Sequence, residues 1–187
     1  MAGGLPAGSG GWIGPAAHER RRSAGRRRPR LGLTSCGIAA IVLASPAGAA
    51  SNNVRITNLG DIAFGTIANP SADAVQSESL CVYANTATNG YNVRAIGSGS
   101  GGAFSLSSAA GSLPFEVQWS SSSGQASGAQ LLPNVALGGQ ISSATQQTCN
   151  SGPAASASLV VILRTAALSS ASAGSYSGAL TLVIGPE

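Results

Sequence analysis

The residues that could perform catalysis or bind a metal are scarce in this chain and lie far apart. The one histidine is His18 and lysine is absent, so no imidazole follows residue 50 for acid–base chemistry, a Ser–His pair or a metal site. Asp73 and Glu78 are the closest acids that could imitate a glycosidase pair. Their position in a turn that leads into a strand favours solvated surface carboxylates. We therefore expect no catalytic residue, no cofactor and no metal site.

The basic charge of the chain is concentrated near its N-terminus. The chain has a formal net charge of +4, but seven of its ten arginines lie at positions 20–30. After residue 50, three arginines oppose five carboxylates and leave a net charge of −2. A nucleic-acid-binding surface needs clustered cations, so no nucleic-acid partner is expected. The glycine-rich run at 97–102 lacks the lysine and the following helix of a phosphate-binding loop.

An export signal accounts for the arginine run. It precedes an apolar stretch, Leu31–Leu43, and small residues at 47–50, an order typical of a secretory signal peptide with cleavage after Ala49 or Ala50. The alternative is a membrane anchor, but Pro46 interrupts the stretch well short of the roughly 20 apolar residues that span a bilayer. We expect residues 1–50 to be removed or disordered, and no stable membrane insertion after cleavage. The protein is then exported.

Residues 51–187 are enough for one domain with one core. They contain two cysteines, Cys81 and Cys149, and an even pair in an oxidising compartment predicts a disulfide. Two cysteines without a histidine cannot complete a zinc site, which disfavours the metal-binding alternative.

Alternating apolar residues predict strands through most of this domain. Leu113–Trp119, Tyr91–Ala95 and Tyr176–Ile184 each place apolar side chains on one face, as expected of half-buried antiparallel strands. Leu159–Leu163 is apolar throughout, which indicates a strand covered on both faces.

Further strand candidates are Ile62–Ile67 and Gln76–Tyr83, and turn residues such as Asn89-Gly90 and Gly138-Gly139 separate the segments. Ser169–Ala173 could form one helical turn at most. The pattern predicts an all-β fold, an antiparallel β-sandwich of about seven strands.

Five segments of the domain, in this order, resemble spore coat U domain proteins, a family that includes subunits of archaic, Csu-type chaperone–usher fimbriae. They are Ile62–Thr66, the strand around Cys81, the strand around Tyr91, Leu113–Val117 and Ala173–Leu182. The resemblance runs from about Asn53 to Ile184.

This resemblance implies an immunoglobulin-like sandwich that lacks one strand and is completed by a donor strand. Its partners would be a periplasmic chaperone, an outer-membrane usher and neighbouring pilin subunits. In such strand addition, main-chain hydrogen bonds supply affinity and alternate apolar side chains fill pockets. The acceptor groove would be bordered by Leu180, Leu182 and Ile184, although these positions fit an ordinary core equally well.

The segment before the Ile62 strand is short for a donor, because Val54 and Ile56 are its only clearly alternating apolar pair. Either this segment donates in a minor way, or it is the first strand of its own domain. In the second case the protein accepts a strand without donating one, as a tip or terminating subunit would.

We expect a structural, non-catalytic subunit of a fimbria or similar surface assembly. The main alternative is a self-contained secreted sandwich that binds a carbohydrate or a surface partner, and a third is a secreted hydrolase without histidine. An exposed Trp119 could stack on a sugar, but its alternation with Phe115 and Val117 favours the core.

Overall fold

The computed structural model describes residues 52–187. The predicted signal peptide and its cleavage site lie outside the described residues. The described chain is built almost entirely of strands, as the alternating pattern predicts. None of its helices is long and apolar enough to cross a membrane.

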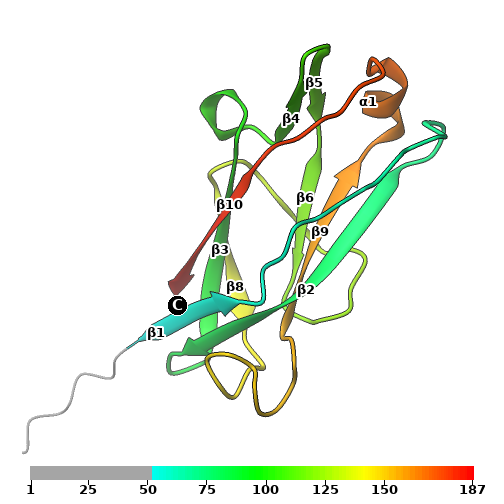
Figure 1. Cartoon of the computed structure of the whole chain (residues 1–187). Helices are drawn as coiled ribbons and strands as arrows, with labels where there is room; N and C mark the ends of the chain where they lie inside the picture. The colour runs from blue at the N-terminus through cyan, green and yellow to red at the C-terminus, as the bar shows by residue number, and fades with distance from the viewer. Residues whose placement is uncertain (1–51) are drawn as a thin grey trace, which may run out of the picture. The chain divides into compact units, whose positions relative to one another are not determined.

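Ten strands and one short α-helix follow one another along the described chain (Figure 1). The strands are β1 Asn53–Thr57, β2 Ala74–Asn85, β3 Gly90–Gly97, β4 Ser105–Ser108, β5 Gly111–Pro114, β6 Glu116–Ser120, β7 Ala129–Leu131, β8 Ala136–Ile141, β9 Ala157–Leu163 and β10 Leu180–Pro186. The helix α1 is Thr165–Ser170, and a 3-10 turn covers Ser100–Gly102.

The strands form an antiparallel sandwich. One sheet has five strands in the order β1-β2-β9-β6-β7, the other has three in the order β10-β3-β8, and β4 pairs with β5 in a separate hairpin. Every paired set of strands is antiparallel. The all-β sandwich predicted from the sequence is confirmed, with β4, β7 and β8 as strands that the alternation did not reveal.

The core lies between the two larger sheets. Each strand contributes every second residue, since neighbouring side chains along a strand point to opposite faces. Leu80 and Val82 of β2, Tyr91 and Val93 of β3 and Trp119 of β6 are almost completely buried there. All seven residues of β9 are buried, which agrees with the continuous apolar run in its sequence.

At the start of β9, the side chain of a buried serine makes hydrogen bonds to β2 in place of the backbone of β9. The register of β2 with β9 ends at Leu80 and Ala157. Beyond it, the hydroxyl of Ser156 accepts a hydrogen bond from the Val82 N–H and donates one to the Val82 carbonyl, both at 2.8 Å. This satisfies backbone groups that would otherwise be buried without partners.

Cys81 and Cys149 are joined by a disulfide. Cys81 lies on β2 and is fully buried, on the face opposite to the sandwich core, where it packs with Ala144. The bond ties the loop at 142–156 to the middle of β2. The sequence separation of the two cysteines is 68 residues.

Two predicted strands have different limits in the structure. The predicted strand Leu113–Trp119 is divided between β5 and β6, because β5 turns away to pair with β4. Its alternation is nevertheless correct, since Leu113, Phe115, Val117 and Trp119 are all buried. β10 begins at Leu180 rather than Tyr176, and the residues before it make only an isolated bridge between Ser177 and Ser107.

Three further local predictions need correction. Gly138-Gly139 is no turn but lies inside β8, where Gly139 has φ +69° and the register with β3 shifts, as in a β-bulge. The helical turn lies at Thr165–Ser170 rather than at 169–173. The predicted strand Ile62–Ile67 has no ladder pairing, although its apolar residues do pack on the core.

Candidate functional site

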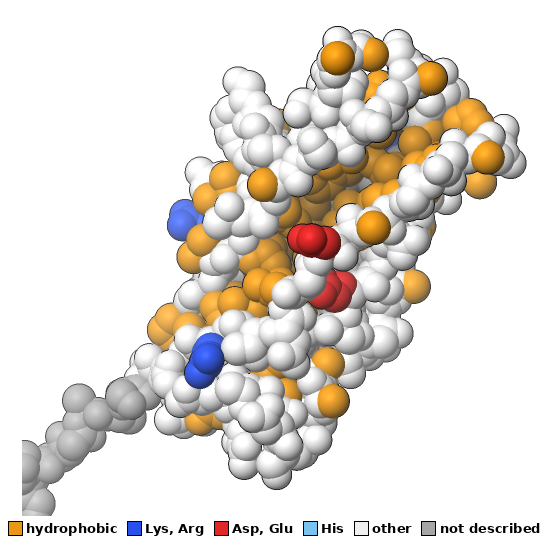
Figure 2. All heavy atoms as spheres, in the orientation of Figure 1, with side chains coloured by type: hydrophobic (Ala, Val, Ile, Leu, Met, Phe, Trp, Pro, Cys, Tyr) orange, Lys and Arg blue, Asp and Glu red, His pale blue; other side chains and the backbone are white. Residues whose placement is uncertain are grey.

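An apolar hollow opens between β10 and the segment that joins β1 to β2. Figure 2 shows this hollow with hydrophobic side chains along its floor. In Figure 1 the red β10 and the cyan segment lie on either side of it, with β6 and β9 of the five-stranded sheet behind. We call this hollow the groove and the segment Gly60–Ile67 its wall.

The β10 side of the groove is an open sheet edge. β10 is hydrogen-bonded to β3 alone, so its other edge has no ladder partner. Leu180, Leu182 and Ile184 lie on its inward face, partly buried against the core, whereas Val183 points outward and is 38% exposed. The residues predicted from the resemblance to border a groove thus lie on the strand beside this hollow.

The wall closes the other side through side chains rather than through a backbone ladder. Ile62, Phe64 and Ile67 are partly buried against the core. In the described chain, the wall residues 60–67 form no backbone–backbone hydrogen bond. The main-chain N–H and C=O groups of the wall therefore have no strand beside them.

The first strand belongs to its own domain in this structure. β1 pairs along its whole length with β2, and Val54 and Ile56 lie opposite Ala84 and Val82. Both side chains are partly buried against the core. Within the described chain this segment is thus part of its own sheet, and whether it also donates to another subunit stays a prediction.

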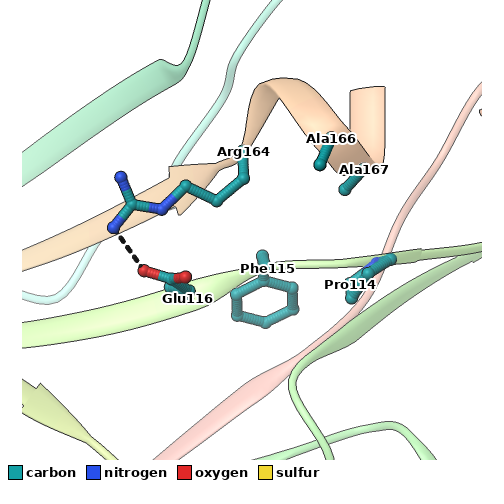
Figure 3. Close-up of a pocket in the computed structure, with 6 residues that line it drawn as sticks. All are labelled: Pro114, Phe115, Glu116, Arg164, Ala166 and Ala167. Carbon is teal, nitrogen blue, oxygen red and sulfur yellow. Dashed lines mark hydrogen bonds and ion pairs between the residues drawn. The ribbon is translucent and has the colours of Figure 1, made fainter. Parts of the chain in front are cut away.

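A pocket of about 370 Å³ lies between the β5–β6 junction and α1 (Figure 3). Pro114, Phe115, Ala166 and Ala167 give it an apolar lining, and Glu116 and Arg164 form its polar side.

An ion-pair cluster beside this pocket joins three elements. Arg164 follows β9 and bonds Glu116 of β6 at 2.5 Å and Asp73, just before β2, at 2.8 Å. Asp73 also accepts hydrogen bonds from the backbone N–H and the hydroxyl of Thr165, at 2.7 and 2.9 Å. Asp73 thereby holds the first residue of α1.

These contacts shift the acid–base behaviour of the cluster. The backbone N–H of Thr165, then the Arg164 guanidinium and the Thr165 hydroxyl, lower the pKa of Asp73 from 3.8 to about 2. Hydrogen bonds to Glu116 and Asp73 raise the pKa of Arg164 further above its usual value. The cluster is a fixed set of opposite charges, which suits a structural role.

Glu78 has a different environment from that of Asp73. It lies on β2 opposite Leu159 of β9, on the face that carries the core. Its Oε1 accepts a hydrogen bond from the Gly60 N–H at 2.5 Å, whereas its Oε2 is buried without a hydrogen-bond partner. Asp73 and Glu78 are five residues apart along nearly extended chain, about 16 Å, which is too far for a glycosidase pair.

Trp119 is only 1% exposed, so its ring is not available at the surface for stacking on a sugar. Within the described residues, no three His, Cys, Asp or Glu side chains gather where they could hold a metal ion.

Sequence reasoning missed the contacts of Arg164 and of Glu78. Arg164 is 91 residues from Asp73 and 48 from Glu116, and no local pattern connects them. The alternation along β2 could have indicated that Glu78 faces inward, because it places this acid on the same face of the strand as Leu80 and Val82.

No family model and no curated protein matches this sequence. A chain in the solved structure of a chaperone–tip adhesin complex, described as vital for synergistic activation of CFA/I fimbriae biogenesis, matches this chain only weakly in structure. The TM-score is 0.45 and the identity 14%, and the match covers 73% of this chain but only 41% of that one. The membership of the spore coat U family stays a prediction from the sequence.

Proposed function

We propose that this protein is a non-catalytic structural subunit of a chaperone–usher fimbria or similar surface assembly, and that an extended strand from a partner fills its groove. The observation that carries this proposal is that the unpaired edge of β10 borders an apolar hollow. The resemblance to spore coat U domain proteins supplies the class of partner. A periplasmic chaperone would fill the groove first and a neighbouring subunit later.

The geometry of the groove suits strand addition. An incoming strand can hydrogen-bond to the free edge of β10, while its alternate side chains cover Leu180, Leu182 and Ile184. Without such a strand, an apolar hollow beside an unpaired edge would favour aggregation.

We further propose that the subunit accepts a strand without donating one, as a tip or terminating component does. β1 is paired with β2 from Asn53 to Thr57, so Val54 and Ile56 already serve their own domain. If export cleaves the chain after Ala49 or Ala50, only two or three residues precede this strand. The protein would then reach the periplasm and afterwards the cell surface.

The test is a gel of material sheared from the cell surface, run in SDS with and without boiling and probed for this chain. We expect a heat-sensitive band that contains this chain and one further subunit. A heat-sensitive ladder of multiples would show that the chain also donates a strand. A monomer in the soluble fraction under both conditions would refute the fimbrial role and favour a self-contained secreted sandwich.

A further inference from the structure

The pocket between the start of β6 and α1 has both of its sides fixed by the ion-pair cluster. Arg164 bonds Glu116 on the β6 side, and Asp73 holds Thr165, the first residue of α1. Asp73 also bonds Arg164, so the cluster links one side of the pocket to the other. Because these contacts set the separation of the two sides, the pocket is formed before any ligand arrives, as most small-molecule sites are.

Most of the pocket lining is apolar. Pro114 and Phe115 line it from the β5–β6 junction, and Ala166 and Ala167 line it from α1 (Figure 3). The Phe115 ring stacks on Phe104, with centroids 5.7 Å apart, which restricts the orientation of the ring. The volume of about 370 Å³ falls within the range in which proteins bind small molecules. The lining therefore suits the apolar body of a small ligand.

The polar side of the pocket offers a hydrogen-bond acceptor that solvent can reach. Oε2 of Glu116 accepts the bond from Arg164, whereas Oε1 accepts none from the described residues. In that part of the chain, the side-chain oxygens that are both buried and unpaired belong to Thr57 and Glu78. Oε1 of Glu116 is therefore open to solvent, in agreement with a side chain that is 32% exposed. A ligand in the pocket can take the place of water at this oxygen.

The charge of the cluster favours a cation at this position. One guanidinium and two carboxylates give the cluster a net charge of −1. The two terminal nitrogens of Arg164 bond Asp73 and Glu116, so the guanidinium already has anionic partners. Figure 3 shows the Glu116 carboxylate between this guanidinium and the Phe115 ring. The polar group nearest the apolar lining is thus a negatively charged acceptor.

We propose that this pocket binds a small molecule with one primary ammonium group on a compact apolar body. The body lies against Phe115, Ala166 and Ala167, and the ammonium donates a hydrogen bond to Oε1 of Glu116. A bond between a charged donor and a charged acceptor is stronger than a neutral one. None of the lining residues belongs to β10 or to the groove wall, so this inference is independent of the proposed function.

The test measures the binding of three probes of similar size to the purified full chain, through the alanine methyl signals of α1 in NMR spectra. The probes are the 2-phenylethylammonium cation, neutral 2-phenylethanol and the phenylacetate anion. We expect the ammonium to shift the signals of Ala166 and Ala167 with a Kd in the millimolar range, which is usual for a ligand of about nine non-hydrogen atoms. It should bind about fivefold more tightly than the alcohol, and phenylacetate should bind more weakly than either.

Two substitutions assign this binding to the pocket and to its acceptor. Glu116→Gln removes the charge with little change of shape, and the ammonium should lose its advantage over the alcohol. Asp61→Asn, at an exposed acid outside the pocket, is the control for charge and should keep the advantage. Ala166→Leu fills the pocket from an exposed position and should abolish binding of both probes. Ser170→Leu, on the same helix but outside the lining, should not.

Each part of the proposal has a result that overturns it. Equal affinity for the ammonium and the alcohol, or tighter binding of phenylacetate, would refute the ligand class, and this comparison needs no variant. Unchanged selectivity in a Glu116→Gln protein that circular dichroism shows to be folded would refute the role of that carboxylate. The pocket itself is refuted if no probe shifts the Ala166 and Ala167 signals, or if Ala166→Leu binds the ammonium normally. None of these results bears on the strand groove.

Discussion

The indole N–H of Trp119 donates a hydrogen bond of 3.1 Å to the phenolic oxygen of Tyr91 in the centre of the sandwich. Trp119 belongs to β6 of the five-stranded sheet and Tyr91 to β3 of the three-stranded sheet, so this bond joins the two layers. The rings meet edge to face, with centroids 6.4 Å apart and an interplanar angle of 78°. Both residues are buried, and this burial raises the pKa of the Tyr91 hydroxyl.

Tyr91→Phe should lower the free energy of unfolding by about 1–3 kcal/mol, because the buried Trp119 N–H then has no acceptor. Urea unfolding followed by far-UV circular dichroism measures the change. Tyr176→Phe is the control: its hydroxyl bonds the Ser172 carbonyl at the surface, where water can replace it, and we expect a much smaller loss. Equal losses in the two variants would show that the buried bond contributes nothing particular to stability.

Replacing both Cys81 and Cys149 by alanine should destabilise the domain by roughly 4 kcal/mol, the chain-entropy value for a loop of this length. The bond constrains the unfolded chain over a separation of 68 residues. The measurement is the midpoint of chemical unfolding for this variant and for the oxidised parent. Adding a reductant should shift the parent toward the variant and leave the variant unchanged. A parent midpoint that is insensitive to complete reduction would contradict the prediction.

The stability of the domain should fall as the pH is lowered from about 4 to 2, in part because of Asp73. Its pKa is about 2 in the folded protein and near 3.8 when its contacts are absent. A depressed pKa contributes stability above the unfolded value and loses that contribution as the pH falls through the folded value.

The variant Asp73→Asn isolates this contribution. It should be less stable than the parent at pH 7, and the difference should shrink toward pH 2, as measured by urea midpoints at each pH. Asp61→Asn, at an exposed acid, should leave the pH profile close to that of the parent. A gap between Asp73→Asn and the parent that is constant from pH 7 to 2 would argue against a carboxylate that titrates differently in the folded state.

Leu182→Asp should prevent formation of the heat-sensitive complex, because it places a charge on the face of β10 that an inserted strand must cover. Val183→Asp is its neighbour on the same strand but faces outward, and we expect it to assemble normally. Shearing and SDS gels without boiling compare the two variants. Near-UV circular dichroism checks that Leu182→Asp is still folded, and Leu182→Gln offers a milder change if it is not. Normal assembly of folded variants at Leu182 would exclude β10 as the acceptor edge.

The local pattern predicted much of the sandwich but not all of its pairing. Alternation correctly placed Leu113, Phe115, Val117 and Trp119 in the core, because side-chain direction in a strand depends only on sequence parity. The same alternation in Ile62–Ile67 predicted a strand where none forms. Those side chains do pack inward, but a β-ladder also requires a neighbouring backbone, and in the described chain this segment has none.

The sequence by itself determined the all-β class, the position of the strands around Tyr91, Cys81 and Val161, and the scarcity of groups for catalysis, since these follow from composition and period. Only the tertiary structure decided that β10 has an open edge, that Arg164 holds both Asp73 and Glu116, and that Glu78 accepts a hydrogen bond from the Gly60 N–H. These features depend on which distant segments become neighbours. That choice is made by the packing of the whole core, and no local pattern records it.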